Sequence, residues 1–214
     1  MDVRILFEDE HIAVVFKPYG MLSERHDSLP NVPAVLEELC GSTIYPVHRL
    51  DRTTEGLVVY AKTPSVAAKL SAAIAGGSVH KAYLAAVEGV AEDGGELRDL
   101  LYFDRTRNKS YVVKRERKGV KEARLVYERL STAEYEGHTV SLVRVELLTG
   151  RTHQIRVQFA SRKHPLVGDR RYGSTVPADN IALCACELIF PHPVTGEEMR
   201  FTCDPTNEIF QVFK

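Results

Sequence analysis

Residues 48–61 read HRLDRTTEGLVVYA, a charged loop followed directly by a compact apolar run. The run over residues 57–61 has the length and composition of a buried strand. Within the loop, Asp51 lies between Arg49 and Arg52, so that two guanidinium groups flank one carboxylate in the sequence. This stretch therefore predicts a rigid strand with one charged carboxylate in the loop just before its N-terminal end.

Asp51 has more than one interpretation from these residues alone. An ionised carboxylate at the end of a strand suits a catalytic nucleophile or an electrostatic stabiliser. Alternatively, Asp51 and a neighbouring arginine close the loop as a structural ion pair. A two-carboxylate glycoside hydrolase using Asp51 with Glu55 is a remote option, because the chain has no tryptophan to form a sugar platform.

Outward from this stretch, hydrophobic patterns predict several strands and a few helices. The helix over 31–39 has Pro33 in its first turn and Gly41 beyond its end. The helix that opens at Pro64 repeats apolar residues every four positions and stops at a Gly-Gly pair. A third helix is expected within 152–163. Strands are expected over residues 5–7, 12–16, 57–61, 81–87, 122–130, 139–149, 181–190 and 198–203. Hairpin-linked strands with a few helices indicate an α+β fold on an antiparallel or mixed sheet.

Composition indicates an ordinary globular protein. The chain has 214 residues, of which 44% are hydrophobic and 27% charged. This length suits one compact domain with a sizeable core or a small bilobed one. No window holds 18 consecutive apolar residues, which argues against a spanning helix. The acidic opening is atypical of a signal peptide, and four cysteines are too few for a disulfide framework in a chain this long. We therefore expect a cytoplasmic protein.

Charge is balanced overall but polarised along the chain. The formal net charge is -1, whereas residues 105–124 carry +7 and residues 151–173 carry +5. Two such basic stretches on one face would attract phosphates while the remainder of the chain repels them. The alternative is that each stretch is simply a solvated surface.

Two further segments contain residue types suited to chemistry. Thr149–Arg156, TGRTHQIR, packs two guanidinium groups, an imidazole and an amide into one corner. Arginine in such a corner can clamp a phosphate or pair bidentately with a buried carboxylate. In Lys81-Ala82-Tyr83, the aromatic ring could lie against a base, although a single strand tyrosine is more often a core residue.

Taken together, these segments resemble the RluA family of RNA pseudouridine synthases. The resemblance extends over nearly the whole chain, and its strength lies in the order and spacing of several motifs. They are FEDEHIAVVFKPYGM (7–21), HRLDRTTEG (48–56), KAYLAAVEG (81–89), LLTGRTHQIRVQ (147–158), HPLVGDRRYG (164–173) and IFPHPVTGEEMRF (189–201).

The resemblance implies a pseudouridine-synthase-like fold, with a mixed, mainly antiparallel sheet, flanking helices and a central active-site cleft. It also implies one catalytic domain over residues 1–214, without a separate N-terminal RNA-binding domain, acting without metal or cofactor. Asp51 would be the essential catalytic group, and Tyr83 would pack on the target base. Arg156 would pair with Asp51 and keep it ionised and oriented.

The implied substrate is a uridine in a folded rRNA or tRNA stem-loop, which must be flipped out of its stack. Arg49 matches a position that displaces the target base. The residues expected to bind RNA are Arg49, Arg52, Lys114, Arg115, Arg117, Lys118, Arg151, His153 and Gln154. We expect a monomer, and the alternative function is a catalytically silent RNA-binding protein of the same fold.

Two positions depart from the family pattern. Many relatives have serine where this chain has Glu55, and many have histidine where it has Cys184. Neither position is expected to carry the bond-breaking step, so the departures bear on substrate choice. A zinc site built from Cys184, Cys186, His48 and His153 is conceivable, but this spacing lacks a second paired knuckle and buried thiols are the better interpretation.

Overall fold

The computed structural model describes residues 2–214, which form two compact units. Unit 1 runs to Lys81 and resumes over Cys184–Pro205, and unit 2 comprises Ala82–Leu183 and Thr206–Lys214. Each unit is therefore assembled from segments far apart in the sequence. That residues 1–214 act as one catalytic domain, with a central active-site cleft, stays a prediction.

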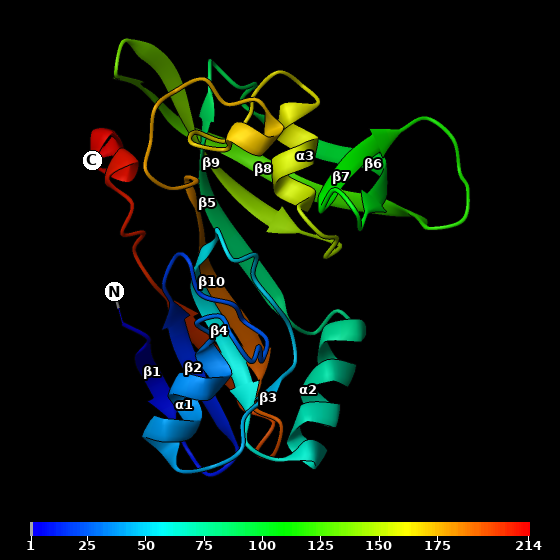
Figure 1. Ribbon diagram of the computed structural model, residues 1–214, viewed down its shortest axis with the longest axis vertical. Helices are drawn as coiled ribbons and strands as arrows, with labels where there is room; N and C mark the ends of the chain where they lie inside the picture. Colours follow the sequence, from blue (N-terminus) through cyan, green and yellow to red (C-terminus); the bar gives the residue numbers. More distant parts are fainter. Residues whose placement is uncertain (1) are drawn as a thin grey trace. The chain divides into compact units, whose positions relative to one another are not determined.

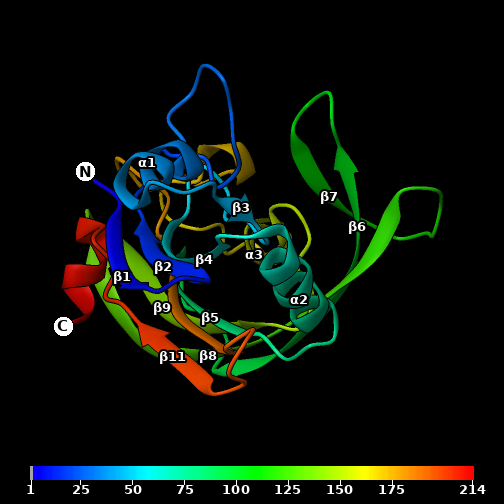
Figure 2. The same cartoon turned by 90° about the horizontal axis from the view of Figure 1, so that it is seen from below.

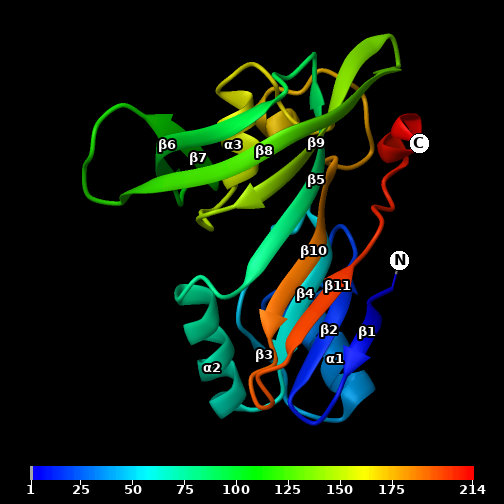
Figure 3. The same ribbon diagram turned by 180° about the vertical axis from the view of Figure 1, so that it is seen from behind.

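Unit 1 is a mixed sheet with two helices (Figure 3). Its elements are β1 (Arg4–Glu8), β2 (Ile12–Lys17), α1 (Val32–Cys40), β3 (Tyr45–Pro46), β4 (Glu55–Ala61), α2 (Pro64–Ala75), β10 (Leu183–Pro191) and β11 (Glu198–Thr202). The strand order is β1-β2-β4-β10, with β11 paired to β10 and β3 to β4. The pairing of β4 with β10 is parallel, and the other pairings are antiparallel.

Both helices of unit 1 begin and end where local side chains satisfy the backbone. The Asn31 side chain accepts from the Ala34 N–H at 3.0 Å, and Gly41 ends α1 in the left-handed region. Thr63 caps α2 in the same way through the Val66 N–H at 3.3 Å. Both helices were predicted from the sequence, and the structure confirms them to within a residue at each end of α1.

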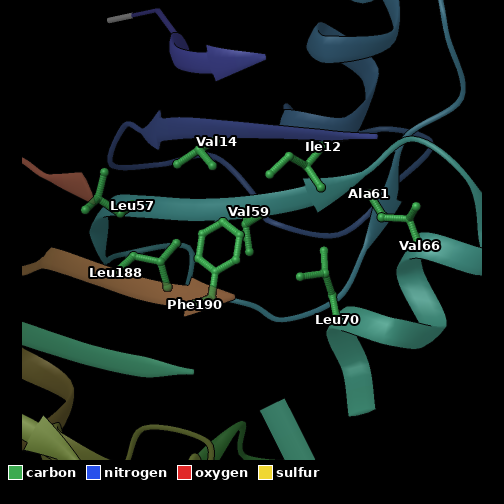
Figure 4. Packing of buried hydrophobic residues seen from close by; sticks show 9 residues of the cluster. All are labelled: Ile12, Val14, Leu57, Val59, Ala61, Val66, Leu70, Leu188 and Phe190. Carbon is green, nitrogen blue, oxygen red and sulfur yellow. The ribbon is translucent and has the colours of Figure 1, made fainter. Parts of the chain in front are cut away.

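The core of unit 1 joins α2 to one face of the sheet (Figure 4). Strands β2, β4 and β10 each contribute apolar side chains, which pack against those of α2. The cluster contains Ile12, Val14, Leu57, Val59, Ala61, Val66, Leu70, Leu188 and Phe190, all buried. Burial of each large side chain of this kind stabilises the fold by about 1.5–3 kcal/mol. The apolar run at 57–61 is thus the buried strand that the sequence predicts.

Unit 2 is built on an antiparallel sheet with strand order β5-β9-β8-β6-β7 (Figure 1). Its elements are β5 (His80–Glu88), β6 (Gly94–Asp104), β7 (Lys109–Val113), β8 (Val120–Tyr135), β9 (His138–Leu147), α3 (Gln154–Ala160) and the 3-10 helices η1 (Arg170–Tyr172) and η2 (Glu208–Phe213). The C-terminal η2 packs Ile209 and Phe210 into a core that also contains Val140 and Val167. Strand β6 and strand β7 form an antiparallel hairpin at the end of this order (Figure 2).

Unit 2 contains two strands that the sequence analysis did not predict, and its helix is shorter than expected. The Gly94-Gly95 pair begins the first of these strands, β6. Residues 109–113 of the basic stretch form the second, the edge strand β7, in which Ser110 is buried and the other side chains are half-buried or exposed. The third helix covers only 154–160. Strands β8 and β9 were both anticipated, although β8 extends over 120–135.

The predicted α+β class with a mixed, mainly antiparallel sheet and flanking helices is confirmed. Along β9, Val143 and Val145 are buried and Glu146 is exposed. This agrees with the alternation of apolar and charged residues in the sequence of the strand. Across residues 2–214, no helix is both long and apolar enough to cross a membrane.

Candidate active site

The backbone of the loop that carries Asp51 is fixed by hydrogen bonds within unit 1. The Thr54 N–H donates to the Asp51 carbonyl at 3.0 Å. The Ser23 hydroxyl donates to the Leu50 carbonyl at 3.1 Å and accepts from the Leu50 N–H at 3.0 Å. Arg52 is tied to the 17–21 turn, because the Gly20 N–H donates to its carbonyl at 2.8 Å. Asp51 is therefore presented on a rigid loop.

The arginines that flank Asp51 in the sequence have partners of their own in unit 1. Arg49 forms an ion pair with Glu24 at 2.7 Å, and both side chains are more than half exposed. Arg52 Nε donates to the Gly20 carbonyl at 2.9 Å. Both guanidinium groups remain accessible at the protein surface.

A buried lysine stands close to this loop, and the sequence analysis did not identify it. Lys17 is fully buried at the end of β2, where its ammonium group donates to the carbonyls of Pro18 and Met21 at 3.0 and 2.9 Å. Burial lowers the pKa of Lys17 to about 8, against the opposing charges of Asp51 and Glu55. The signal was present in the sequence, since a lysine ends the apolar run IAVVFK.

The two positions that depart from the family pattern lie side by side on neighbouring strands of unit 1. Glu55 is buried at the start of β4 and lies in register opposite Cys184 on the parallel strand β10. Cys184 also lies against Cys203, with the two sulfurs 4.0 Å apart. Hydrogen bonding to Cys203, burial and the nearby charge of Glu55 all raise the pKa of the Cys184 thiol, which therefore stays protonated.

The close approach of β4 and β10 depends on Gly56. Its φ of +116° is unfavourable for a residue with a side chain, and a Cβ there would lie 2.3 Å from the Ala185 carbonyl oxygen. The glycine of HRLDRTTEG thus permits the parallel pairing that follows the Asp51 loop.

His48, at the start of this loop, is a neutral imidazole that binds the backbone of β4. Its Nε2 accepts from the Val59 N–H at 3.1 Å, so the proton is on Nδ1. Burial, and then the charge of Lys81, hold the pKa of His48 well below its usual value. Burial likewise lowers the pKa of Lys81 to about 8.

In unit 2, Arg156 forms a bidentate ion pair that the sequence analysis missed. Arg156 Nε and Nη2 donate to the two carboxylate oxygens of Asp169 at 2.6 and 3.0 Å. Only 4% of the Arg156 side chain and 1% of the Asp169 side chain are exposed. Asp169 was detectable as the one acid in the basic stretch 151–173. The expected pairing of Arg156 with Asp51, which belongs to unit 1, stays a prediction.

Tyr83 is buried on β5, in register opposite Val145 of β9. Its location in the strand agrees with the core environment that a single strand tyrosine usually has. Its stacking on a target base stays a prediction.

The corner before α3 is organised by Gln154, whose side chain is buried. Its Oε1 accepts from the Thr149 hydroxyl at 2.8 Å and from the Arg151 N–H at 3.0 Å, and its Nε2 donates to the Arg124 carbonyl at 3.0 Å. Arg151 Nε donates to the Glu122 carbonyl at 2.9 Å. Gln154 therefore shapes the corner that carries Arg151.

His153 caps α3 in a left-handed conformation, with φ +55°, which is uncommon for a residue other than glycine. Its buried ring contacts Phe103 and Tyr172 edge to face. His153 lies immediately before the helix, and both His153 and Arg156 contact the same tyrosine, Tyr172.

Four basic residues expected to bind RNA are all exposed in the loop between β7 and β8, namely Lys114, Arg115, Arg117 and Lys118. The Arg117 guanidinium lies over the Tyr102 ring, 4.6 Å from its centroid. Arg124, in the same basic stretch, instead forms an ion pair within the sheet, between β8 and β6, with Glu96 at 2.6 Å. Four exposed positive charges therefore lie within five residues of this loop.

The zinc site considered from the sequence has no counterpart in the described part of the chain. Among residues 2–214, no group of three or more histidine, cysteine or acidic side chains is arranged to hold a metal ion. All four cysteines are free thiols.

Comparisons with known proteins identify the class of this fold and site. A family model described as RNA pseudouridylate synthase matches residues 11–161. The tRNA pseudouridine synthase C of Vibrio vulnificus is 32% identical, over 92% of this chain and 88% of that protein. The dual-specificity RNA pseudouridine synthase RluA of Vibrio cholerae is 36% identical, over 89% of this chain and 78% of that protein.

A solved structure shares the fold. Human RNA pseudouridylate synthase domain containing 1 has a TM-score of 0.81 to this chain, at 24% identity, over 95% of this chain and 84% of that one. The class is therefore that of isomerases acting on RNA. This chain belongs to the RNA pseudouridylate synthase family, and its reaction converts uridine in RNA to pseudouridine. The resemblance to the RluA family is confirmed.

Proposed function

We propose that this enzyme isomerises one uridine in a tRNA or rRNA stem-loop, with Asp51 as the essential catalytic group. The observation that carries the proposal is that the family match over residues 11–161 includes Asp51, Tyr83 and Arg156 together. Relatives named tRNA pseudouridine synthase C and ribosomal large subunit pseudouridine synthase D support a tRNA or rRNA substrate.

The reaction breaks the N-glycosidic bond of uridine, turns the uracil, and rejoins it to the ribose through C5. The hydrogen on C5 leaves as a proton and the freed N1 takes up a proton, so the composition is unchanged and the overall change is an isomerisation. Asp51 either attacks the sugar to give a covalent intermediate or removes a sugar proton to give a glycal. Both routes need an ionised carboxylate at a fixed position, and the hydrogen-bonded loop of unit 1 holds the backbone of Asp51 in place.

The detached uracil must be retained while it turns. In our proposal, the Tyr83 ring packs on the target base and apolar side chains exclude water around it. Arg156 pairs with Asp51 and keeps its charge and orientation. The guanidinium of Arg156 has five donors, of which the Asp169 carboxylate receives two.

RNA binding is assigned to exposed positive charge. Arg49 fills the space left by the flipped base, and Arg52 and Arg151 contact nearby phosphates. The loop residues Lys114, Arg115, Arg117 and Lys118 hold the stem. Buried His153 and Gln154 act on RNA through the backbone of the 149–153 corner, which they hold in shape.

We further propose that the enzyme works in the cytoplasm as a monomer. Free thiols at all four cysteines suit a reducing compartment.

The test is tritium release from RNA labelled at uridine C5, taken from cells that lack this gene and separated into tRNA and rRNA. We expect release by the wild type from one pool. Asp51→Asn should lower the rate by at least about 10⁴-fold, because an amide can neither attack the sugar nor remove its proton. The variant should bind RNA as the wild type does.

Asp27→Asn is the matched control, since Asp27 is an exposed aspartate of the same unit, and it should keep full activity. Activity retained by Asp51→Asn would overturn the assignment of Asp51. Binding without release by the wild type from either pool would favour a silent RNA-binding protein.

A further inference from the structure

The segment 168–173, GDRRYG, contains the 3-10 helix η1 and follows α3 in unit 2. The proposed function assigns no role in catalysis or RNA binding to Arg171 or Tyr172 of this segment. Three of its side chains make specific contacts in different directions. Asp169 holds Arg156 in a bidentate pair. Arg171 Nη1 donates to the carbonyls of Arg107 and Asn108, both at 2.9 Å, which fastens the turn of the β6–β7 hairpin.

Tyr172 contacts both of these regions through one side chain. The face of its ring lies against the Arg156 guanidinium, with Cζ 5.1 Å from the ring centroid. A guanidinium over an aromatic face gains electrostatic attraction, most strongly where water is excluded. The ring and Asp169 therefore fix two different sides of the Arg156 guanidinium group.

The hydroxyl of Tyr172 binds the hairpin. It accepts from the Ser110 N–H of β7 at 2.8 Å and lies 3.0 Å from His153 Nδ1. Burial raises the pKa of Tyr172 to about 12, so the phenol keeps its proton at neutral pH and can donate it to His153. Lys109, at the start of β7, adds its ammonium group 5.1 Å from the centroid of the same ring.

The hairpin held in this way carries part of the basic stretch. Arg105 and Arg107 lie exposed in its turn, and Lys109 Nζ donates to the Arg171 carbonyl at 2.7 Å. A phosphate backbone bound at this hairpin would therefore be connected to Arg156 through a single aromatic side chain.

We propose that Tyr172 is a positioning residue that links RNA held by the β6–β7 hairpin to the placement of Arg156. The ring fixes the guanidinium, and the hydroxyl fixes the hairpin. This inference rests on the proposed role of Arg156 in catalysis. It predicts that the two ends of the tyrosine affect different kinetic constants.

Two substitutions separate the two ends. Tyr172→Phe keeps the ring under Arg156 and removes the hydroxyl, leaving the Ser110 N–H and the His153 ring without that partner. We expect KM and the Kd for RNA to rise about tenfold, with kcat within about threefold of the wild type. Tyr172→Leu removes the ring as well, and we expect kcat to fall about 100-fold because Arg156 is no longer held in position.

The measurements are tritium release over a range of RNA concentrations, RNA affinity in an Asp51→Asn background, and urea unfolding of each variant. Tyr135→Phe, which removes a half-buried tyrosine hydroxyl elsewhere in unit 2, is the matched control and should change neither constant. If Tyr172→Leu fails to fold, the contrast between KM and kcat in Tyr172→Phe decides the matter.

Arg156→Lys distinguishes the failure of this inference from failure of the proposed function. Lowered kcat in Arg156→Lys with wild-type constants in both Tyr172 variants would overturn the role of Tyr172 alone. Equal loss of kcat in Tyr172→Phe and Tyr172→Leu would also overturn it, because the two ends would then not act separately. Full activity of Arg156→Lys would overturn the assigned role of Arg156 and this inference with it.

Discussion

The loop 48–56 of unit 1 and the corner 149–156 of unit 2 have similar residue types but opposite electrostatic environments. Each contains two arginines, a histidine and a glycine. In the loop, Arg49 and its partner Glu24 have exposed fractions of 58% and 55%. In the corner, Arg156 and its partner are almost completely buried.

The difference comes from the element on which each arginine lies. Arg49 is in a loop at the surface, whereas Arg156 lies within α3, which packs against β6 and β7. An exposed pair is screened by water and contributes little to stability, so its guanidinium is available to a ligand. A buried pair must keep both partners, because an uncompensated buried charge is costly. Burial thus separates arginines that can contact RNA from arginines that organise the site.

The largest effect expected from this comparison is on the buried pair. Asp169→Ala leaves the Arg156 charge buried without its bidentate partner and should lower the free energy of unfolding by about 3–5 kcal/mol. Glu24→Ala, which removes the partner of Arg49, should lower it by less than about 1 kcal/mol. Urea unfolding of both variants measures the difference. Similar losses in the two variants would show that burial does not distinguish these pairs.

The glycines of the two segments give a second, smaller contrast. Gly56→Ala places a Cβ within 2.3 Å of the Ala185 oxygen at a φ of +116°, whereas a Cβ at Gly150 meets no heavy atom within 4 Å. We expect Gly56→Ala to cost about 2–3 kcal/mol through steric overlap and backbone strain. Gly150→Ala should change stability by less than about 1 kcal/mol.

Thermal or urea unfolding provides the measurement for both glycine variants. Tolerance of alanine at position 56 would mean that β4 and β10 can separate without loss of the fold.

The smallest change in stability is expected from the exposed charges of the β7–β8 loop. Replacing Lys114, Arg115, Arg117 and Lys118 together with alanine should alter the free energy of unfolding by less than about 1 kcal/mol. The same change should weaken RNA binding and reduce the slope of log Kd against log salt by up to about 3, because fewer counterions are released.

RNA affinity measured over a series of salt concentrations tests this expectation. Lys69→Ala, an exposed lysine on α2, is the control and should leave the slope unchanged. An unaltered slope in the fourfold variant would remove the loop from the RNA-binding surface.

Much of the fold follows from local sequence signals. Helices α1 and α2 were predicted from a proline at the start, a glycine beyond the end and, for α2, apolar residues at every fourth position. The buried strand β4 and the alternating strand β9 follow from their apolar patterns. Strands β6 and β7 were missed because they lie at the end of the sheet order, where charged and glycine residues replace the apolar alternation that marks a strand.

The candidate site divides in the same way. Asp51, Tyr83 and Arg156 were selected from motif spacing, and the family match includes all three. Lys17, Asp169 and Tyr172 were not selected, although each lies within a motif of the sequence. Lys17 binds backbone carbonyl groups, and Asp169 and Tyr172 contact residues that are distant in the sequence. No local sequence pattern predicts contacts of either kind.

The sequence by itself determined the α+β class, the principal strands and helices, and the family with its reaction, because these depend on periodicity, capping and motif order. Only the tertiary structure decided which charges are buried. It paired Arg156 with Asp169, set Glu55 opposite Cys184, and brought Tyr172 between Arg156 and the β6–β7 hairpin. The physical reason is that desolvation and hydrogen-bond geometry arise from packing between distant segments, which residue types and spacing alone do not specify.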